Sequence, residues 1–425
     1  MFHQTHDLFI EFDSPNWKFV QDTLMDLNSV DISVIPKLQA HLWGFVNYKI
    51  LNSPDTNKSE FESYLQWAVP QILSLPSEFP EGLSKYFTEP IIRLSKKKCL
   101  IILLSLFFCC SERVHTFLDI REKAKYNCFL TYLKQMKLKS DEELNSEFLT
   151  IERKRLHPYS PINFWLKNES PLKKLFSDKQ KKIEDFDDSF LKVDFANQFI
   201  GGGVLNYGCV QEEILFSIYP EMLVSMIFCP VMKEDEAIII NGARRVAEYS
   251  GYAWGFKFEG EYLRDQDPSK NTFVAIDALM FPSLNFQFSE EGVLREANKA
   301  YVGFLKNCAD KEEELPPVVT GKWGCGEFGG FSQLKTMIMW IAASVAGRDM
   351  HMSTFGDRNL EMLDEVARLY EGQPVGELVK LIVFNENREL LERLIEIKVN
   401  PGSNRFMPVA KKKIKLSMPK NKKIN

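Results

Sequence analysis

The sequence predicts a layered α/β domain preceded by a mostly helical region. From about residue 183 onward, short apolar or β-branched runs of strand length alternate with longer helical stretches. Before residue 155, apolar residues instead recur at helical spacing, and prolines separate the segments. The expected strands lie at residues 191–195, 237–241, 273–278, 317–320 and 351–354, and the clearest helices between them at residues 211–216 and 334–346.

Length and composition indicate a globular chain with room for two domains. The chain has 425 residues, of which 45% are hydrophobic and 12% aromatic. Its formal net charge of −5 gives no indication of nucleic-acid binding, so a polyanionic ligand would need local clusters of cations. The eight cysteines include no C-x-x-C pair, which favours reduced thiols over a disulfide framework. The six histidines are dispersed, and we expect no metal site.

Residues 1–155 are predicted to form a helical accessory domain, with helices for example at residues 17–25 and 61–69. The apolar run at residues 99–110 follows three lysines, but it is shorter than the ~20 residues needed to cross a bilayer. We therefore expect a buried helix there. The N-terminus lacks the basic and apolar segments of a secretory signal, so we expect an intracellular protein that does not span a membrane.

Two basic segments border the domain expected at residues 156–400. Residues 153–182 carry nine lysines and arginines and three prolines, which is typical of a connection. Its cations either contact phosphates of a polymer or form a solvated surface. The tail at residues 401–425 contains clustered lysines, which indicates a flexible segment, a nuclear localisation signal or a weak nucleic-acid contact.

The stretch with the clearest chemical potential follows the expected strand at residues 191–195. Gly201, Gly202 and Gly203 come first, and Glu212 and Glu213 follow at an expected helix start. Consecutive glycines let the backbone approach a ligand closely, and their N–H groups can form an anion-binding concavity. Adjacent carboxylates beside it indicate acid or base chemistry on a phosphorylated substrate. The alternative is a tight turn before an acidic helix start, where glutamate is favoured in any case.

The spacing of these residues resembles the signature of the poly(ADP-ribose) glycohydrolases, in which VDFAN precedes GGG and QEE follows it seven residues later. Similar blocks follow in the same order at residues 248–253, 274–279, 320–330 and 354–357. The long helical region before the motif is similar to the eukaryotic members. The resemblance implies a macrodomain, a mixed β-sheet flanked by helices that binds ADP-ribose.

The resemblance also implies an activity and its partners. The activity is hydrolysis of the ribose–ribose O-glycosidic bonds of poly(ADP-ribose), which releases ADP-ribose without a metal or organic cofactor. The implied partners are the polymer, ADP-ribose and poly(ADP-ribosyl)ated proteins. A monomer in the nucleus or cytoplasm is expected, with no membrane and no direct nucleic-acid contact required.

The catalytic roles are carried over from the resemblance. Glu213 is the general acid that protonates the leaving oxygen and the base that then activates water. Glu212 holds ribose hydroxyls. Asp194 and Asn197 position the ribose or brace the loop, and Gln211 acts in the same way. Asp194 could instead accept hydrogen bonds from backbone N–H groups. A helix start lowers the pKa of a carboxyl while burial raises it, and the sequence leaves the balance at Glu213 open.

The expected binding contacts surround these residues. Both glycine segments, residues 201–203 and 324–330, would clasp the diphosphate, the second through Gly326. Aromatic rings would contact the terminal ADP-ribose, unless they are ordinary core residues. An isoleucine–glutamate pair would meet the adenine edge. The substrate-binding residues implied are Ile183, Glu184, Asn197, Gly201, Gly202, Gly203, Gln211, Tyr252, Gly326, Phe328 and Phe355.

The sequence departs from the family pattern at two places. Lys322 and Glu327 stand in the second glycine segment where asparagine and alanine are expected. Lys322 could help to bind phosphates, whereas Glu327 adds a negative charge near them. Residues 185–188 replace a glycine-rich turn with an acidic stretch.

Two other functions remain open from the sequence alone. Gly324, Gly326 and Gly329 form a G-x-G-x-x-G pattern after an expected strand, with Asp349 20 residues beyond Gly329, which is typical of NAD-dependent oxidoreductases. Against this hypothesis, Asp349 precedes the next strand instead of ending it. A third hypothesis is a non-catalytic ADP-ribose-binding module in which the glutamates have no chemical role.

Overall fold

The computed structural model describes residues 63–399, apart from 64–66, 69, 73, 110–119, 206, 281–283, 311–314 and 385–389. The helix expected at residues 17–25 and the basic tail at 401–425 lie outside the described residues. Of the segment at 61–69, only residues 63, 67 and 68 are described.

An eight-stranded mixed sheet runs through the centre of the molecule, in the order β1-β2-β5-β8-β4-β9-β10-β3. The five strands β8, β4, β9, β10 and β3 are parallel, and β5, β2 and β1 extend the sheet antiparallel from β8. The strands are β1 (Ile91–Ser95), β2 (Phe148–Arg155), β3 (Leu175–Asp178), β4 (Leu191–Ala196), β5 (Glu236–Asn241), β8 (Thr272–Asp277), β9 (Val318–Thr320) and β10 (Met350–Ser353). All five strand segments expected from the sequence are therefore confirmed, as is the α/β class.

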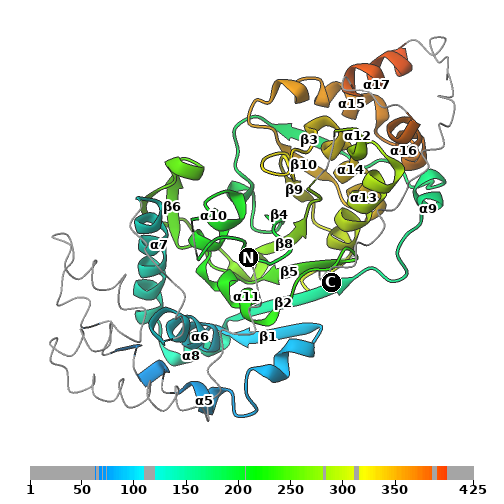
Figure 1. Ribbon diagram of the computed structural model, residues 1–425. Helices are drawn as coiled ribbons and strands as arrows, with labels where there is room; N and C mark the ends of the chain where they lie inside the picture. The colour runs from blue at the N-terminus through cyan, green and yellow to red at the C-terminus, as the bar shows by residue number, and fades with distance from the viewer. Residues whose placement is uncertain are drawn as a thin grey trace, which may run out of the picture.

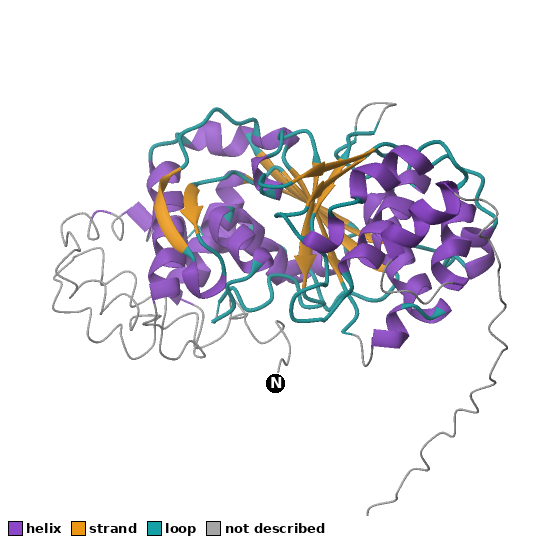
Figure 2. Ribbon diagram, turned by 90° about the horizontal axis from the view of Figure 1, so that it is seen from above, coloured by secondary structure: helices purple, strands orange, loops and turns teal. Residues whose placement is uncertain are grey.

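Helices cover both faces of this sheet (Figure 2). Strand β5 shows why, because its side chains alternate between two apolar cores: Ala237 and Ile239 enter one, and Ile238 and Ile240 the other. Helices α13 (Glu290–Phe304) and α14 (Ser332–Val345) close the first core. Helices α6 (Lys96–Cys109) and α10 (Gln211–Ile218) close the second. A sheet buried on both faces in this way favours strands that are apolar throughout; most of β8 is apolar, whereas β4 also buries Lys192 and Asp194.

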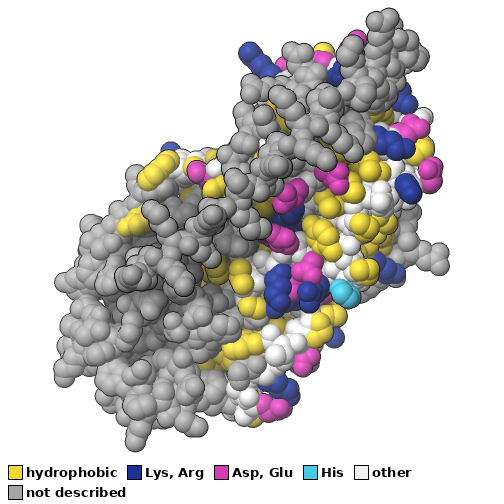
Figure 3. Space-filling model, turned by 45° about the vertical axis from the view of Figure 1, so that its right-hand side comes forward, with side chains coloured by type: hydrophobic (Ala, Val, Ile, Leu, Met, Phe, Trp, Pro, Cys, Tyr) yellow, Lys and Arg dark blue, Asp and Glu magenta, His cyan; other side chains and the backbone are white. Residues whose placement is uncertain are grey.

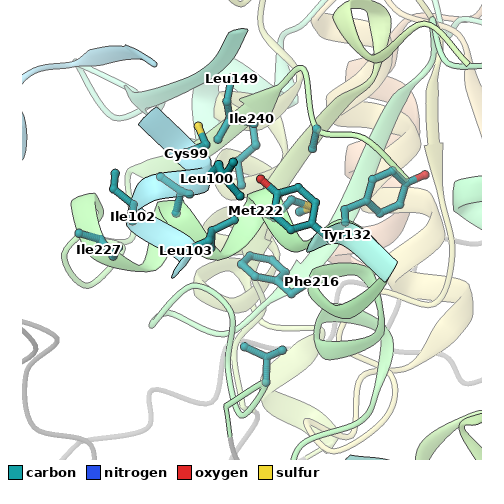
Figure 4. Packing of buried hydrophobic residues seen from close by; sticks show 14 of the residues in the cluster. Cys99, Leu100, Ile102, Leu103, Tyr132, Leu149, Phe216, Met222, Ile227 and Ile240 are labelled. Atoms are coloured by element: carbon teal, nitrogen blue, oxygen red, sulfur yellow. The ribbon is translucent and has the colours of Figure 1, made fainter. Parts of the chain in front are cut away.

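The apolar run at residues 99–110 forms most of α6, and its described side chains are buried, which confirms the expected buried helix. Figure 4 shows Cys99, Leu100 and Leu103 packed with Phe216, Met222 and Ile240 of the α/β region. Among the described residues, no helix is long and apolar enough to cross a membrane.

The sheet crosses the boundary expected at residue 155. Strand β2 ends there and pairs with β5, and β1 pairs with β2. The described part of the region before residue 155 thus contains two strands in addition to its helices, because pairing with a distant strand leaves no trace in local helical spacing. The division into an accessory domain, a catalytic domain and a tail stays a prediction.

A two-stranded sheet projects beside α10 and α7 (Ile120–Lys137) (Figure 1). It consists of β6 (Ala247–Ser250) and β7 (Lys257–Glu261). The remaining helices are α5 (Leu75–Glu78), α8 (Asp141–Ser146), α9 (Ile162–Leu166), α11 (Ser225–Phe228), α12 (Leu284–Gln287), α15 (Leu363–Tyr370), α16 (Val375–Phe384) and α17 (Leu390–Val399).

The basic segment at residues 153–182 is partly neutralised by the protein itself. Arg153 pairs with Glu236 at 2.7 Å, and Arg155 pairs with Asp235 at 2.6 Å. Figure 3 shows cationic and acidic side chains lying side by side on the face it presents. These pairs favour the solvated-surface interpretation over a phosphate contact for the start of the segment.

Candidate active site

The candidate site lies where the parallel strands end. The first glycine loop, residues 197–210, joins β4 to α10, and the second glycine loop, residues 321–331, joins β9 to α14. Strand β4 pairs with β8 on one side and β9 on the other. Because the carboxyl ends of parallel strands meet at one edge, these loops converge there, and ligands of open α/β sheets bind at such an edge.

Both glutamates of α10 bind the backbone of the first glycine loop. Glu212 accepts hydrogen bonds from the N–H of Asn197 at 2.9 Å and of Gly201 at 2.7 Å. Glu213 accepts from the N–H of Gly203 and of Val210, both at 2.9 Å. The two side chains are 3% and 6% exposed, respectively. The acidic helix start is therefore folded into the site instead of facing solvent.

This arrangement changes the expected role of the glycine triplet. The N–H groups of Gly201 and Gly203 donate to the glutamates, and that of Gly202 donates to the carbonyl of Phe199 at 3.0 Å. All three N–H groups are used within the chain, so the triplet does not present the open diphosphate clasp that the sequence suggested. A carboxylate of the same chain fills the concavity that would otherwise attract an anion.

Glycine is required at this position for close approach to the carboxylates. Gly202 has φ +49°, and a Cβ added there would lie 2.6 Å from oxygens of both Glu212 and Glu213. Gly201 has φ +87°, and its Cβ would lie 2.6 Å from the sulfur of Met226. Only a residue without a side chain fits both the backbone conformation and the space.

Asp194 lies beneath these glutamates on β4, and its side chain is fully buried. Neither carboxyl oxygen has a hydrogen-bond partner among the described residues. Burial raises the pKa of Asp194 well above its usual range, and the nearby Glu213 charge adds to this. Burial also raises the pKa of Glu212, with Asp194 contributing, although its two N–H donors oppose the shift. Burial therefore prevails over the helix start at Glu212, and the cluster retains a proton at pH values where an exposed carboxyl is ionised.

The structure does not support the idea that Asp194 accepts backbone N–H groups. Instead, the side chains of Gln211 and Asn197 accept hydrogen bonds from backbone N–H groups. Gln211 accepts from the N–H of Phe195 at 2.8 Å and donates to the carbonyl of Val193 at 3.0 Å. The side chain of Asn197 accepts from the N–H of Phe199 at 3.0 Å. Gln211 therefore holds the start of α10 against β4, and Asn197 braces the loop from within.

The second glycine loop, unlike the triplet of the first, has backbone N–H groups that make no hydrogen bond within the described residues. The N–H of Gly330 closes the loop on the carbonyl of Gly324 at 2.8 Å. Gln287 secures its far end, because it donates to the carbonyl of Gly329 at 3.0 Å and accepts from the N–H of Phe331 at 2.7 Å. Within the described residues, no hydrogen bond uses the N–H of Gly326, Glu327 or Phe328. Gly326 is exposed, and a Cβ on it would meet open space.

A buried ionic network lies under this loop. Lys335 of α14 is fully buried, forms an ion pair with Glu296, and lies 3.5 Å from the centre of the Trp323 ring. Its Nζ is 3.3 Å from the position of a Cβ on Gly324. The network continues through Arg295, which contacts both Glu296 at 2.7 Å and Asp277 at 2.6 Å, to Lys299, which contacts Asp277 at 2.7 Å. The network thus joins three basic and two acidic side chains below the loop, and burial lowers the pKa of Lys335 well below its usual range.

Aromatic side chains border the site. Tyr252, at the tip of the β6–β7 hairpin, is 58% exposed, and Phe355, just after β10, is 52% exposed with φ +50°. Partial burial raises the pKa of Tyr252, the N–H of Gln211 opposes the shift, and the Glu213 charge adds to it. Because Gln211 and Glu213 both affect this pKa, the Tyr252 ring lies beside the start of α10. Core packing is therefore excluded for Tyr252 and Phe355, whereas Phe328 is half-buried and packs against the core.

The pair Ile183 and Glu184 forms a buried turn before β4. Glu184 accepts a hydrogen bond from the hydroxyl of Tyr249, and burial raises its pKa. The acidic stretch that replaces the expected glycine-rich turn is also satisfied internally, since Asp185 pairs with the buried Arg245 at 2.7 Å. Sequence reasoning missed Tyr249 and Arg245, because each acts through a partner about sixty residues away.

The two departures in the second glycine loop behave differently. Lys322 lies 3.6 Å from Asp357, which follows Phe355, so it links two loops of the site. Glu327 is exposed and does not enter the buried network. In the described part of the chain, no group of three histidine, cysteine or acidic side chains could hold a metal ion.

The dinucleotide hypothesis is not favoured. The G-x-G-x-x-G pattern does join a strand to a helix, as that hypothesis requires. However, Asp349 precedes β10 and therefore lies at the edge of the sheet opposite to the loop. Its side chain accepts from the N–H of Lys174 at 3.0 Å, which is a structural role.

The mixed sheet between helical layers, with its site at the ends of the parallel strands, defines the chain as a macrodomain protein. Residues 162–362 match the family model described as poly(ADP-ribose) glycohydrolase with a macro domain fold. Over these residues, which make up just under half of its length, the chain is similar to the poly(ADP-ribose) glycohydrolase family.

Similar proteins come from a plant and a nematode. A probable poly(ADP-ribose) glycohydrolase 2 of Arabidopsis thaliana is 33% identical over 297 residues, which cover 58% of this chain and 57% of the relative. Poly(ADP-ribose) glycohydrolase 1 of the same plant is 35% identical, covering 48% of this chain and 50% of the relative. Poly(ADP-ribose) glycohydrolase 1 of Caenorhabditis elegans is 33% identical, covering 63% of this chain and 36% of the relative. The aligned regions thus span about half or less of these relatives.

Proposed function

We propose that this chain hydrolyses the ribose–ribose O-glycosidic bonds of poly(ADP-ribose) and releases ADP-ribose. The observation that carries the proposal is the cluster of Asp194, Glu212 and Glu213, buried together at the edge of a macrodomain sheet. The match of residues 162–362 to the glycohydrolase family model supports it. The cluster would supply the proton that the reaction needs.

Glu213 is the proposed acid and base. Its carboxyl protonates the oxygen that leaves when the glycosidic bond breaks, and the sugar then passes through an oxocarbenium-like state. A water molecule adds to that sugar carbon and gives a proton back to Glu213. Each carboxylate has about four lone-pair sites. The two backbone N–H groups held by each glutamate therefore leave sites free for substrate hydroxyls.

The other residues would bind and orient. Glu212 would hold ribose hydroxyls, since its place in the loop is fixed by Asn197 and Gly201. Asp194 would keep a proton available within the cluster. The diphosphate would bind the N–H groups of the second glycine loop around Gly326, above the ionic network that includes Lys335.

The terminal ADP-ribose would lie between the two exposed rings, Tyr252 and Phe355, with its adenine edge at Glu184. Aromatic faces suit a base or sugar because stacking needs little charge complementarity. Phe328 would shape the second glycine loop from below, and Ile183 would form the apolar floor beside Glu184.

The proposed partners follow from this substrate. They are poly(ADP-ribose) and the proteins that carry it, met by a monomer in the nucleus or cytoplasm. Neither nucleic acid nor a membrane is required. We further propose that residues 1–155 serve as an accessory region, packed on the catalytic part through α6.

Incubation of the purified chain with poly(ADP-ribose), followed by chromatography of the products, tests the proposal. We expect free ADP-ribose, and far less of it with Glu213→Gln. A protein that retains polymer on a filter without releasing ADP-ribose is a binding module. A protein that does neither would exclude both hypotheses.

A parallel incubation in EDTA addresses cofactors. The proposed chemistry uses carboxyl groups alone, so the rate should be unchanged in chelator. Loss of hydrolysis in EDTA, restored by one particular ion, would rule out this mechanism.

A further inference from the structure

The tip of the β6–β7 hairpin carries a second exposed aromatic residue. Trp254 is 76% exposed and lies two positions after Tyr252. Two residues of chain span at most about 7 Å, so the backbone of Trp254 lies close to that of Tyr252, whose ring is proposed to contact the terminal ADP-ribose. A large aromatic side chain exposed on a hairpin tip beside a candidate site is a feature that the proposed binding of the terminal unit does not use.

The hairpin tip is held in one conformation. Gly251 has φ +73°, and a Cβ on it would lie 1.9 Å from the carbonyl oxygen of Gly255. The N–H of Gly255 donates to Tyr252 at 2.9 Å, and that of Phe256 donates to Ala253 at 3.1 Å. Phe256 is fully buried and anchors the tip. A rigid platform loses little conformational entropy when it binds a ligand.

The chemistry of the polymer places a base at this position. Each ribose–ribose bond joins the terminal unit to a hydroxyl on the adenosine ribose of the next unit. The leaving oxygen that Glu213 would protonate therefore belongs to a sugar that also carries an adenine. While the terminal unit occupies the cleft, that adenine must lie just outside it, within one sugar of Glu213.

Exposed aromatic residues flank Glu213 at this point. Trp254 and Tyr252 stand on the hairpin side, where Tyr252 senses the Glu213 charge. On the side of the first glycine loop, Tyr207 is 55% exposed. It adjoins Gly208, where an added Cβ would lie 2.7 Å from a Glu213 oxygen.

We propose that Trp254, together with Tyr207, forms a subsite that stacks the adenine of the leaving unit. The inference rests on the proposed hydrolase function and extends it to the polymer beyond the cut bond. Stacking on an aromatic face accepts a base without hydrogen-bond readout, which suits a repeating polymer.

Steady-state hydrolysis by Trp254→Ala tests the subsite with two substrates. One is poly(ADP-ribose), and the other is ADP-ribose linked at the same sugar carbon to a nitrophenol, which has no adenine in its leaving group. We expect kcat/KM on the polymer to fall about 5- to 150-fold, the effect of losing one base stack. Hydrolysis of the nitrophenyl substrate and the Kd for free ADP-ribose should not change.

Two further variants control the experiment. Trp254→Phe should recover most of the activity on polymer, because it keeps an aromatic face. Leu263→Ala removes another highly exposed apolar side chain, 82% exposed beyond β7, and should behave as the wild type. Equal losses on both substrates, or no loss on polymer, would overturn the subsite. A wild-type protein that releases no ADP-ribose from polymer but cleaves the nitrophenyl substrate would instead refute the proposed function.

Discussion

The two glycine loops have similar backbone features and opposite electrostatic surroundings. Each follows a parallel strand, contains glycines with positive φ and precedes a helix. The first glycine loop is packed on three buried carboxyl groups, and its triplet N–H groups are consumed by that packing. The second is packed on Lys335 and its network, and it leaves donors open around Gly326.

This difference shows that a glycine-rich loop does not by itself identify a phosphate site. What lies behind the loop decides what the loop can bind, because a backbone N–H is satisfied by whichever acceptor is closest. Carboxylates behind the first loop support the proposed acid–base role. Cations behind the second loop make it suitable for an anion. The pairing suits a substrate with a diphosphate at one end and a scissile sugar bond at the other.

The largest expected effect is at the acidic loop. Glu213→Gln keeps the size and the acceptor for Gly203 but cannot transfer a proton. We expect hydrolysis to fall by about 10²–10⁴-fold, the usual scale of general acid–base catalysis. The affinity for ADP-ribose, measured by calorimetry, should change little. If the variant cleaved polymer at a near wild-type rate, the acid would have to be sought at Asp194.

A second substitution tests the cationic loop. Lys335→Met removes the cation nearest Gly324 and leaves Glu296 buried without that partner, which costs about 3–5 kcal/mol of folding free energy. We expect the Kd for ADP-ribose to rise about tenfold, which corresponds to ~1.4 kcal/mol, while the Kd for adenosine stays constant. Binding of the two ligands compared by calorimetry gives the answer.

The double variant Lys335→Met with Glu296→Gln separates charge from folding. It should regain much of the lost stability, since no buried charge is left unpaired at that position, yet it should still bind ADP-ribose weakly. If the double variant regained both its stability and its affinity for ADP-ribose, the network would only support the fold. The electrostatic difference between the two loops would then not explain what they bind.

The aromatic border should affect binding alone, without the loss of stability expected for Lys335→Met. Tyr252→Ala and Phe355→Ala should each weaken ADP-ribose binding by roughly 1–3 kcal/mol, the range for base stacking. Both side chains are more than half exposed, so thermal unfolding should be nearly unchanged. Unfolding of both variants with unaltered affinity in the folded fraction would return these rings to the core.

Much of this arrangement could be predicted from the sequence, and the failures have a common cause. The strands at residues 191–195 and 273–278 and the positions of Glu212 and Glu213 follow from local patterns. Strands β1 and β2 were missed because their pairing depends on distant residues. Lys335 gave a signal that could have been used, since it is a cation within an apolar helix. Its partner Glu296 lies on another helix, and no local pattern joins them.

The sequence also did not reveal that the N–H groups of residues 201–203 bind acceptors within the chain. The motif showed that glycines and glutamates lie near one another. It could not show that the loop folds back so that each glutamate binds the backbone of that loop. Such contacts depend on three-dimensional closure, so the expectation that both glycine loops clasp the diphosphate could not take them into account.

The smallest expected effect concerns how the stability of the folded protein depends on pH. The pKa of Asp194 is raised by burial, so the folded protein holds a proton that the unfolded chain releases above about pH 4. Stability from this group is full below that pH and declines as pH rises toward the folded pKa. Asp194→Asn removes the titration and adds a donor for the neighbouring carboxylates.

We therefore expect Asp194→Asn to unfold at a temperature about 2–4 °C above the wild type at pH 8, the shift that ~1 kcal/mol produces in a domain of this size, with the gap closing toward pH 5. Hydrolysis should fall, because Asp194→Asn removes a proton that the proposed reaction uses, although the same substitution stabilises the fold. Neutralising Glu296 at the second loop should do the opposite and lower the unfolding temperature at both pH values, since Lys335 would lose its counter-charge. Differential scanning calorimetry of the two variants across this pH range decides the matter. Two results would contradict the comparison: a Glu296→Gln variant that is more stable than the wild type, or an Asp194→Asn variant that is less stable at pH 8. Either result would show that buried charge does not distinguish the two glycine loops.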